Sequence, residues 1–183
     1  MVQPINSQPL VRPSLTRNIQ IREIKPGDPE LAMMPPPSEV IESRFRQNAF
    51  CLGAFRKGEM IGYIWLGQKA YQEDEARCIY LVTPREEAVF DFDLYIFPKH
   101  RLGIAFVAIW DGTNRFLSDR GIRYTYSRLT RFNLVSRRSH QHLGGRRIGR
   151  AVFLKVWGVQ LTAATVFPYL HLAPPASPGP RLT

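Results

Sequence analysis

The sequence has few of the residues that cross-link small domains, since its 183 residues include only two cysteines, Cys51 and Cys78. Two isolated thiols provide neither a disulfide framework nor the paired spacing of a zinc site, so we expect both to be reduced and buried. The four histidines lie apart except for His140 and His142, whose i, i+2 spacing directs them to different faces of a helix. The sequence therefore predicts no metal site.

Long apolar runs are also scarce. The first 17 residues contain three prolines and no apolar segment of the kind that a secretory signal needs. The most apolar stretch, residues 151–173, is interrupted by Lys155 and Gln160 and is interpreted as two strands rather than a membrane-spanning helix. These features predict a cytoplasmic protein without a membrane span.

Acidic residues are absent from the last third of the chain. All fifteen lie at or before Asp119, so residues 120–183, with eleven basic residues, account for the net charge of +10, whereas residues 1–119 sum to about −1. A basic segment of this kind indicates an anionic partner, which can be a nucleic acid, a membrane surface or a phosphorylated small molecule. Twenty of the 25 basic residues are Arg, so the base composition of the genome is an alternative explanation.

The hydrophobic pattern predicts strands and helices in mixed order. The expected strands are 19–24, 49–56, 60–66, 77–82, 89–97, 122–129, 148–156 and 159–166, and the expected helices are 39–47, 101–120 and 133–143. This order predicts an α+β fold with a mixed, largely antiparallel central sheet flanked by helices. We expect one domain over residues 19–167, a mobile N-terminal tail at 1–18 and a proline-rich, disordered C-terminal tail at 168–183.

The strand expected at 89–97 is the most informative. Simple alternation places two groups of side chains on opposite faces, Phe90, Phe92, Leu94 and Ile96 on one and Asp91, Asp93 and Tyr95 on the other. Two carboxyl groups on one face would raise the pKa of one of them, and either could accept a proton from an amine. Pairing with Arg, or plain exposure to solvent, would explain the same two acids.

The segment His100–Ala105 lies between this strand and the next predicted helix. The unpaired N–H groups at the start of a helix form an anion site, and the small residues Gly103 and Ala105 allow an anion to approach the backbone. Tight packing of the helix on the sheet explains the same small residues.

The run Leu94-x-Ile96-x-Pro98-x-x-Arg101-x-Gly103-x-Ala105 resembles a signature of the GNAT N-acetyltransferase superfamily. In that family a central strand enters a loop of the form Arg/Gln-x-x-Gly-x-Gly/Ala, which cradles the pyrophosphate of coenzyme A. Here His100 stands at the usual Arg or Gln position, and Leu102 stands where a further glycine is common.

A second run, Asn133-x-x-Ser136-x-x-x-His140-x-x-x-Gly144, resembles a helix of the same family. There the Asn contacts the coenzyme arm, and a Tyr at the position of His140 often protonates the departing thiolate. Ser136 replaces the usual Ala. Asn133 as a plain helix N-cap, and His140 as a surface residue, remain alternatives.

The resemblance covers about residues 19–165 and implies transfer of an acyl group, usually acetyl, from acyl-CoA to a primary amine in a ternary complex. It implies a coenzyme site made by Ile96, His100, Arg101, Leu102, Gly103, Ile104, Ala105, Asn133 and Ser136. The catalytic candidates are Asp93 and Asp91 as bases and His140 as acid, with Tyr95 and Tyr126 as alternative acids. Arg101 and either Arg137 or Arg138 are further candidates for phosphate contacts.

In this interpretation the partners are acetyl-CoA and an unidentified amine, and no nucleic acid is expected. The acyl donor would lie between the strands at 89–97 and 122–129. Two alternatives stay open: a basic nucleic-acid-binding module, in which aromatic residues stack on bases, and a catalytically inactive CoA-binding protein. The apolar final strands either pack within the chain or pair with a second copy as a homodimer.

Overall fold

The computed structural model describes all of residues 1–183 and has an α+β architecture, as the sequence predicts. The strands are β1 Val2–Pro4, β2 Ile19–Ile24, β3 Phe50–Arg56, β4 Glu59–Gln68, β5 Ala70–Gln72, β6 Ile79–Leu81, β7 Ala88–Ile96, β8 Tyr124–Ser127, β9 Ala151–Val156, β10 Val159–Ala164, β11 Leu170–Ala173 and β12 Arg181–Leu182. The helices are α1 Pro13–Thr16, α2 Ser38–Arg46, α3 Ala105–Ser118 and α4 Leu134–His142, with short 3-10 turns η1 Pro29–Met33 and η2 Pro98–His100.

The main sheet has six strands in the order β1-β8-β7-β4-β3-β2. All neighbours are antiparallel except β7 and β8, which run parallel because α3 crosses between them. The predicted hairpin of β3 and β4 is present, and β4 is buried over eight consecutive residues. The mixed, largely antiparallel sheet expected from the sequence is therefore confirmed.

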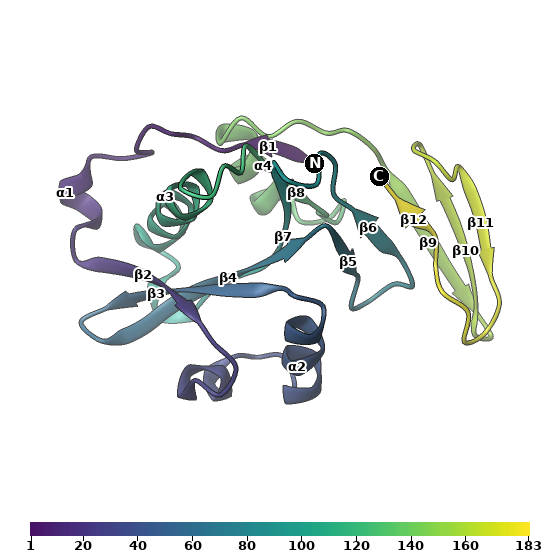
Figure 1. Ribbon diagram of the computed structural model, residues 1–183, viewed down its shortest axis with the longest axis horizontal. Coiled ribbons are helices and arrows are strands. Elements are labelled where there is room, and N and C mark those ends of the chain that lie inside the picture. The colour runs from purple at the N-terminus through teal and green to yellow at the C-terminus, as the bar shows by residue number, and fades with distance from the viewer.

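Helices cover both faces of this sheet (Figure 1). On one face α3 packs Ile109, Trp110 and Leu117 against β3 and β4, which explains the helical spacing of these apolar residues. On the other face α2 contributes Ile41 and Phe45 to a second cluster. The two clusters fix the ends of β7 and α3, the elements on which the candidate site is built.

The expected N-terminal tail is instead part of the sheet. Strand β1 pairs with the outer edge of β8, and the N–H of Leu10 donates to Asp111 Oδ1 at 2.9 Å. The chain does not return to the sheet after α4, so β1 pairs with an edge that would otherwise have unpaired backbone groups. A three-residue strand is too short to produce an alternating sequence pattern.

The expected disorder after residue 167 is also not what the structure shows. Strand β11 adds to β10 and β9 in a separate three-stranded sheet, and β12 pairs in parallel with β6. Proline breaks strands but does not prevent short ones between breaks, and the five prolines here lie outside both strands.

Candidate active site

Strand β8 ends part-way along its neighbour β7. Parallel pairing joins Ala88–Asp91 to Tyr124–Ser127, where β8 ends, while β7 continues to Ile96. On the side away from β4, the backbone of residues 92–96 has no strand partner, and we call this stretch the open edge. An unpaired strand edge is a row of hydrogen-bond donors and acceptors that an extended ligand can use.

The open edge leads directly into the N-terminus of α3. Six consecutive backbone N–H groups, those of residues 102–107, donate to no protein acceptor. A helix start ordinarily leaves about four such groups, and the dipole adds positive charge to them. Gly103 carries no side chain in front of these donors, and a methyl group there would meet only His100 O, at 3.6 Å. The arrangement suits an anion such as a phosphate.

The side chains around this helix start are held in different ways. Arg101 donates through Nε to Ile96 O at 3.0 Å and lies over the ring of Tyr95, which leaves its two terminal nitrogens unpaired. His100 is half-buried and its Nε2 has no partner. Leu102 is fully exposed, and Ile104 is the residue that precedes α3. The residues predicted for the coenzyme loop thus lie together around the free N–H groups.

A β-bulge in β7 separates the two predicted acids. Pairing with β4 shifts between Tyr63 and Trp65, and Asp93 has a φ of +47° in the middle of the strand. Because the extra residue reverses the alternation, Asp91 faces α4 while Asp93 and Tyr95 face the α2 side, and Phe92 no longer shares a face with Leu94. The prediction that Asp91 and Asp93 share a face is therefore wrong, and Asp93 is not among the groups that shift the pKa of Asp91.

Asp93 belongs to an ion-pair network that the sequence did not reveal. Arg44, on α2, is 5% exposed and donates to Asp93 Oδ2 at 2.6 Å and to Asp74 Oδ2 at 2.7 Å. Burial alone would lower the pKa of Arg44, but the hydrogen bonds that it donates to Asp93 and Asp74 outweigh this effect and raise the pKa. Oδ1 of Asp93 makes no hydrogen bond, so this oxygen remains free to accept one beside the open edge.

Asp91 lies in a buried polar cluster at the point where β8 ends beside β7. Both of its carboxylate oxygens accept from Ser127 Oγ, at 2.8 and 2.7 Å. Burial raises the pKa of Asp91, against the opposing effects of His140 and the hydroxyl donors. His140 is 4% exposed, its Nδ1 lies 3.0 Å from Gln3 Oε1, and its ring packs edge-on against Trp110.

His140 is therefore neither a surface residue nor well suited to the acid role predicted for it. Burial lowers its pKa, and the nearby Asp91 only partly offsets this, so the neutral imidazole is favoured. A general acid needs the protonated form near neutral pH. The cluster instead joins α4 and β1 to the end of β8.

The buried His140 makes stability depend on pH. As the pH falls through about 6.5, the ordinary value, the unfolded chain gains a proton that folded His140 does not accept, so stability falls by at most about 1.4 kcal/mol per pH unit. We expect His140→Gln to reduce the fall in Tm between pH 7 and pH 5. The exposed neighbour variant His142→Gln should keep the wild-type slope, and Asp91 is present in all three proteins. Equal slopes in both variants would contradict a buried, neutral His140.

Two of the residues predicted to bind coenzyme from helix α4 are already hydrogen-bonded within the protein. Asn133 is the N-cap, and its Oδ1 accepts the N–H of Ser136 at 3.0 Å, which leaves only its amide NH2 for a ligand. Arg137 donates to Arg131 O, and Arg138 is exposed without a bonding partner. The capping alternative thus accounts for Asn133 by itself.

The hydroxyl groups of the two tyrosines proposed as acids differ in their hydrogen bonding. Tyr126 donates to Thr83 O at 2.6 Å, whereas the Tyr95 hydroxyl makes no hydrogen bond to the protein. Tyr95 stacks on Tyr63 with a ring separation of 5.6 Å and lies on the same face as Asp93. Of the candidate acids, Tyr95 is therefore the one with a free hydroxyl on the same face as Asp93.

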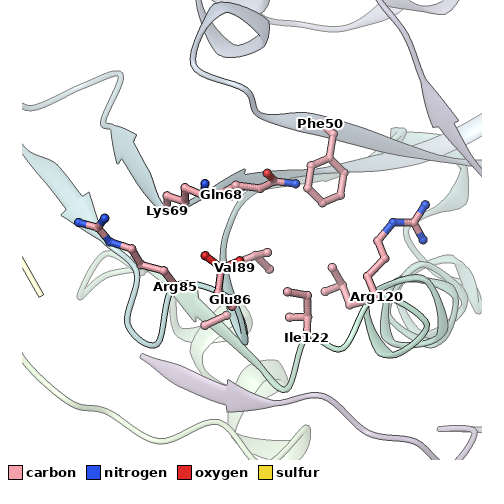
Figure 2. A pocket seen from close by; sticks show the side chains of 10 residues that line it. Phe50, Gln68, Lys69, Arg85, Glu86, Val89, Arg120 and Ile122 are labelled. Carbon is pink, nitrogen blue, oxygen red and sulfur yellow. The ribbon is translucent and has the colours of Figure 1, made fainter.

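Two surface pockets lie elsewhere, near the C-terminal end of α3. One of about 170 Å³ is bordered by the starting residues of β7, the end of β4 and the end of α3, with Gln68, Lys69, Arg85 and Arg120 around it (Figure 2). Its neighbour, of about 380 Å³, shares Phe50, Gln68 and Arg120. Since α3 has 14 residues, these pockets are roughly 20 Å from the free N–H groups at its other end. The charged side chains in Figure 2 do not converge on one point.

No model of a known protein family matches the chain, and no curated protein matches it in sequence. Solved structures do match its fold. The aminoglycoside N-acetyltransferase AAC(6')-Iy, in complex with a bisubstrate analogue of CoA and acetylneamine, has a TM-score of 0.54 and 17% identity over 75% of this chain and 97% of its own. The ribosomal-protein-alanine N-acetyltransferase of Brucella melitensis biovar Abortus 2308 has a TM-score of 0.55 and 15% identity over 75% and 99%.

The chain has the GNAT fold. A third example, the aminoglycoside 6'-N-acetyltransferase AAC(6')-Ih of Acinetobacter baumannii, has a TM-score of 0.52 and 18% identity, covering 75% of this chain and 97% of that one. These proteins are spanned almost end to end, whereas about a quarter of this chain lies outside each match. The match to these solved structures confirms the fold that the two short sequence runs implied.

No three His, Cys, Asp or Glu side chains are grouped so as to hold a metal ion. None of the helices combines the length and apolar character of a membrane span.

Proposed function

We propose that the protein is an acyl-CoA-dependent N-acetyltransferase that acetylates a primary amine by direct attack in a ternary complex. The observation that carries the proposal is the row of six free N–H groups at the start of α3, directly after the open edge of β7. The matched solved structures include N-acetyltransferases bound to CoA and to a CoA analogue, which supports the same co-substrate.

The residues present fit acetyl-CoA, which would supply an activated thioester acyl group. The N–H groups of residues 102–107 would bind its pyrophosphate, and the free nitrogens of Arg101 would add a charged contact. The open edge offers backbone donors and acceptors to the amides of the pantetheine arm, and Asn133 offers its free NH2. His100, Ile104, Ala105 and Ser136 would form the walls around these contacts.

Asp93 is proposed as the general base. Its ion pair with Arg44 fixes the carboxylate, while Oδ1 is free to accept the proton that the amine loses as its nitrogen bonds to the acyl carbon. Tyr95 is proposed to donate its hydroxyl proton to the departing thiolate. Asp91, although predicted as a second base, is enclosed with Ser127 and His140 and holds the strands at the inner end of the site.

The acceptor is proposed only as a primary amine. The acidic residues at 73–75 do not select a cationic acceptor, because Asp74 is bound to Arg44, and Glu73 and Glu75 are bound to Arg128. Their charge is largely neutralised within the protein. The matched structures differ in acceptor, since some act on aminoglycosides and one on a ribosomal-protein alanine.

Thermal stabilisation by ligands tests the proposal against the nucleic-acid alternative. With coenzyme at 100 times its Kd, stabilisation is about 2.7 kcal/mol, or roughly 5–10 °C for a chain of this size. We expect acetyl-CoA and CoA to raise Tm by this amount at both low and high salt, and a generic oligonucleotide to have no salt-tolerant effect. A salt-sensitive shift with the oligonucleotide alone would reject the coenzyme site.

An enzyme and an inactive CoA-binding protein differ in turnover. Release of free thiol from acetyl-CoA, with an aminoglycoside and with a peptide that begins with alanine as acceptors, measures it directly. A coenzyme-induced Tm shift without any acceptor-dependent thiol release would support CoA binding but reject acetyl transfer to these acceptors.

A further inference from the structure

The three-stranded sheet of β9, β10 and β11 lies at one end of the molecule, beyond β5, β6 and β12 (Figure 1). Its inner face is polar and attaches it to the rest of the chain. The side-chain amide of Gln160 is fully buried and bonds both the N–H and the carbonyl of Arg77, at 2.9 and 2.7 Å. Lys155 donates to the carbonyl of Glu75. These contacts fix the orientation of the small sheet.

The outer face of this sheet is entirely apolar, the reverse of a surface sheet that faces water. In one row across the strands Leu154, Leu161 and Leu172 are direct neighbours, and in the next row Ala163 lies between Val152 and Leu170. The exposed fractions are 57% for Val152, 57% for Leu154, 58% for Val156, 36% for Leu161, 68% for Leu170 and 63% for Leu172. No charged side chain interrupts this face.

The exposed area is large for a monomer. These six side chains together expose roughly 600 Å², the upper end of the largest apolar patch on an ordinary monomeric protein. Two such faces packed together would bury about 1,200 Å², the lower limit of a specific and stable interface, before the exposed Trp157 and Tyr169 at the ends of the sheet are added.

We propose that this outer face, called the β9–β11 face, binds the same face of a second copy of the chain. Two sheets pack through interdigitated aliphatic side chains about 10 Å apart, and such packing needs a flat face without charges. The row of three leucines forms a ridge, and Ala163 leaves a depression beside it. Under a two-fold axis the ridge of each copy fits the depression of the other, so a single surface supplies both halves of the contact.

An anionic membrane is the main competing partner, because the chain is basic and Trp157 is exposed. Surfaces that lie on membranes combine an apolar face with Lys or Arg close around it. Within the three strands the one Lys or Arg is Lys155, which points to the opposite face, and Arg150 before β9 is a single charge at one end of the sheet. The observations therefore favour the second copy.

The first experiment measures mass in solution for the full chain at tens of micromolar. We expect about twice the 21.0 kDa of one chain for the wild type and the monomer mass for Leu154→Glu combined with Leu172→Glu. Leu15→Glu is the matched control, because Leu15 is also 57% exposed but lies on α1, and it should remain dimeric. A monomeric wild type, or a dimer unaffected by the double substitution, would overturn the proposal.

A second variant does not depend on the charged variants being folded. Leu161→Cys places a thiol at the centre of the face, whereas native Cys51 and Cys78 are buried. A bismaleimide should cross-link Leu161→Cys into a covalent dimer and leave Leu15→Cys monomeric. Absence of cross-linking, or wild-type binding to anionic vesicles that the double substitution abolishes while the protein in solution is monomeric, would overturn the dimer.

Discussion

Asp93→Asn is expected to lower the kcat of acetyl transfer by about 10²–10⁴-fold, the range that removal of a general base produces. The amide keeps the size and the position of the carboxylate but cannot take up the amine proton. Coenzyme affinity should hardly change, because the free N–H groups at α3 lie beyond the end of β7 and do not involve Asp93. Measuring kcat and the coenzyme-induced Tm shift on the same preparations separates the two effects.

The chain offers a close control for this substitution. Asp74 binds the same guanidinium as Asp93, and the two side chains are 28% and 27% exposed. Asp74→Asn therefore also removes one negative charge beside Arg44, with a similar loss of stability, but it leaves Asp93 Oδ1 unchanged. We expect Asp74→Asn to keep kcat within a few-fold of wild type. If both variants lose kcat equally, Asp93 acts only through the ion pair and is not the base.

The sequence predicted those parts of the fold that repeat over many residues. Strand β4 is a continuous apolar run and helix α3 carries its apolar residues with a period of 3.6, and both were located to within a few residues. The position of the proposed coenzyme loop between β7 and α3 followed from Pro98 and the small residues after it. Two short motifs at the correct places in this order were enough to indicate the GNAT fold.

The errors arose where a single residue or a distant contact decides the geometry. One extra residue at Asp93 reverses the faces of β7, and nothing in V-F-D-F-D-L-Y-I-F distinguishes a bulged strand from a regular one. The role of Arg44 could not be inferred from the sequence, because its two carboxylate partners lie 30 and 49 residues away. His140 is buried by β1, which the sequence placed in a tail.

Acetyl transfer is inferred from the residues of the site and not from the fold alone, because one fold can carry different functions.

The exposed β9–β11 face lies in the part of the chain where sequence patterns predicted a strand pair without revealing which side the core was on. Its inner residues Gln160 and Thr162 are fully buried, while Leu161 between them points outward. A period of two gives the two faces of a strand, but only tertiary contacts determine which face is covered.

Gly103→Asp is expected to weaken binding of CoA by roughly five-fold to 1,000-fold. A carboxylate beside the free N–H groups would occupy the place of a phosphate and repel it, and two like charges about 4 Å apart cost about 1–4 kcal/mol between bulk water and a protein surface. The folded structure should tolerate the change, because Gly103 has no positive φ and a Cβ there meets His100 O at 3.6 Å. An acid near a helix start in fact stabilises the helix by about 0.3–1 kcal/mol.

Because Gly103→Asp is expected to keep or raise stability while it weakens CoA binding, unfolding cannot explain a loss of affinity. Titration of CoA by calorimetry, with the Tm of the free protein measured alongside, should show Gly103→Asp as stable as wild type or slightly more so, with much weaker binding. Gly103→Ala adds the Cβ without the charge and should bind CoA nearly as the wild type does. The loss in Gly103→Asp should shrink as salt rises, since added ions screen an exposed repulsion. Unchanged affinity in Gly103→Asp would mean that the phosphates of CoA do not lie against the start of α3, and the proposed coenzyme site would be wrong.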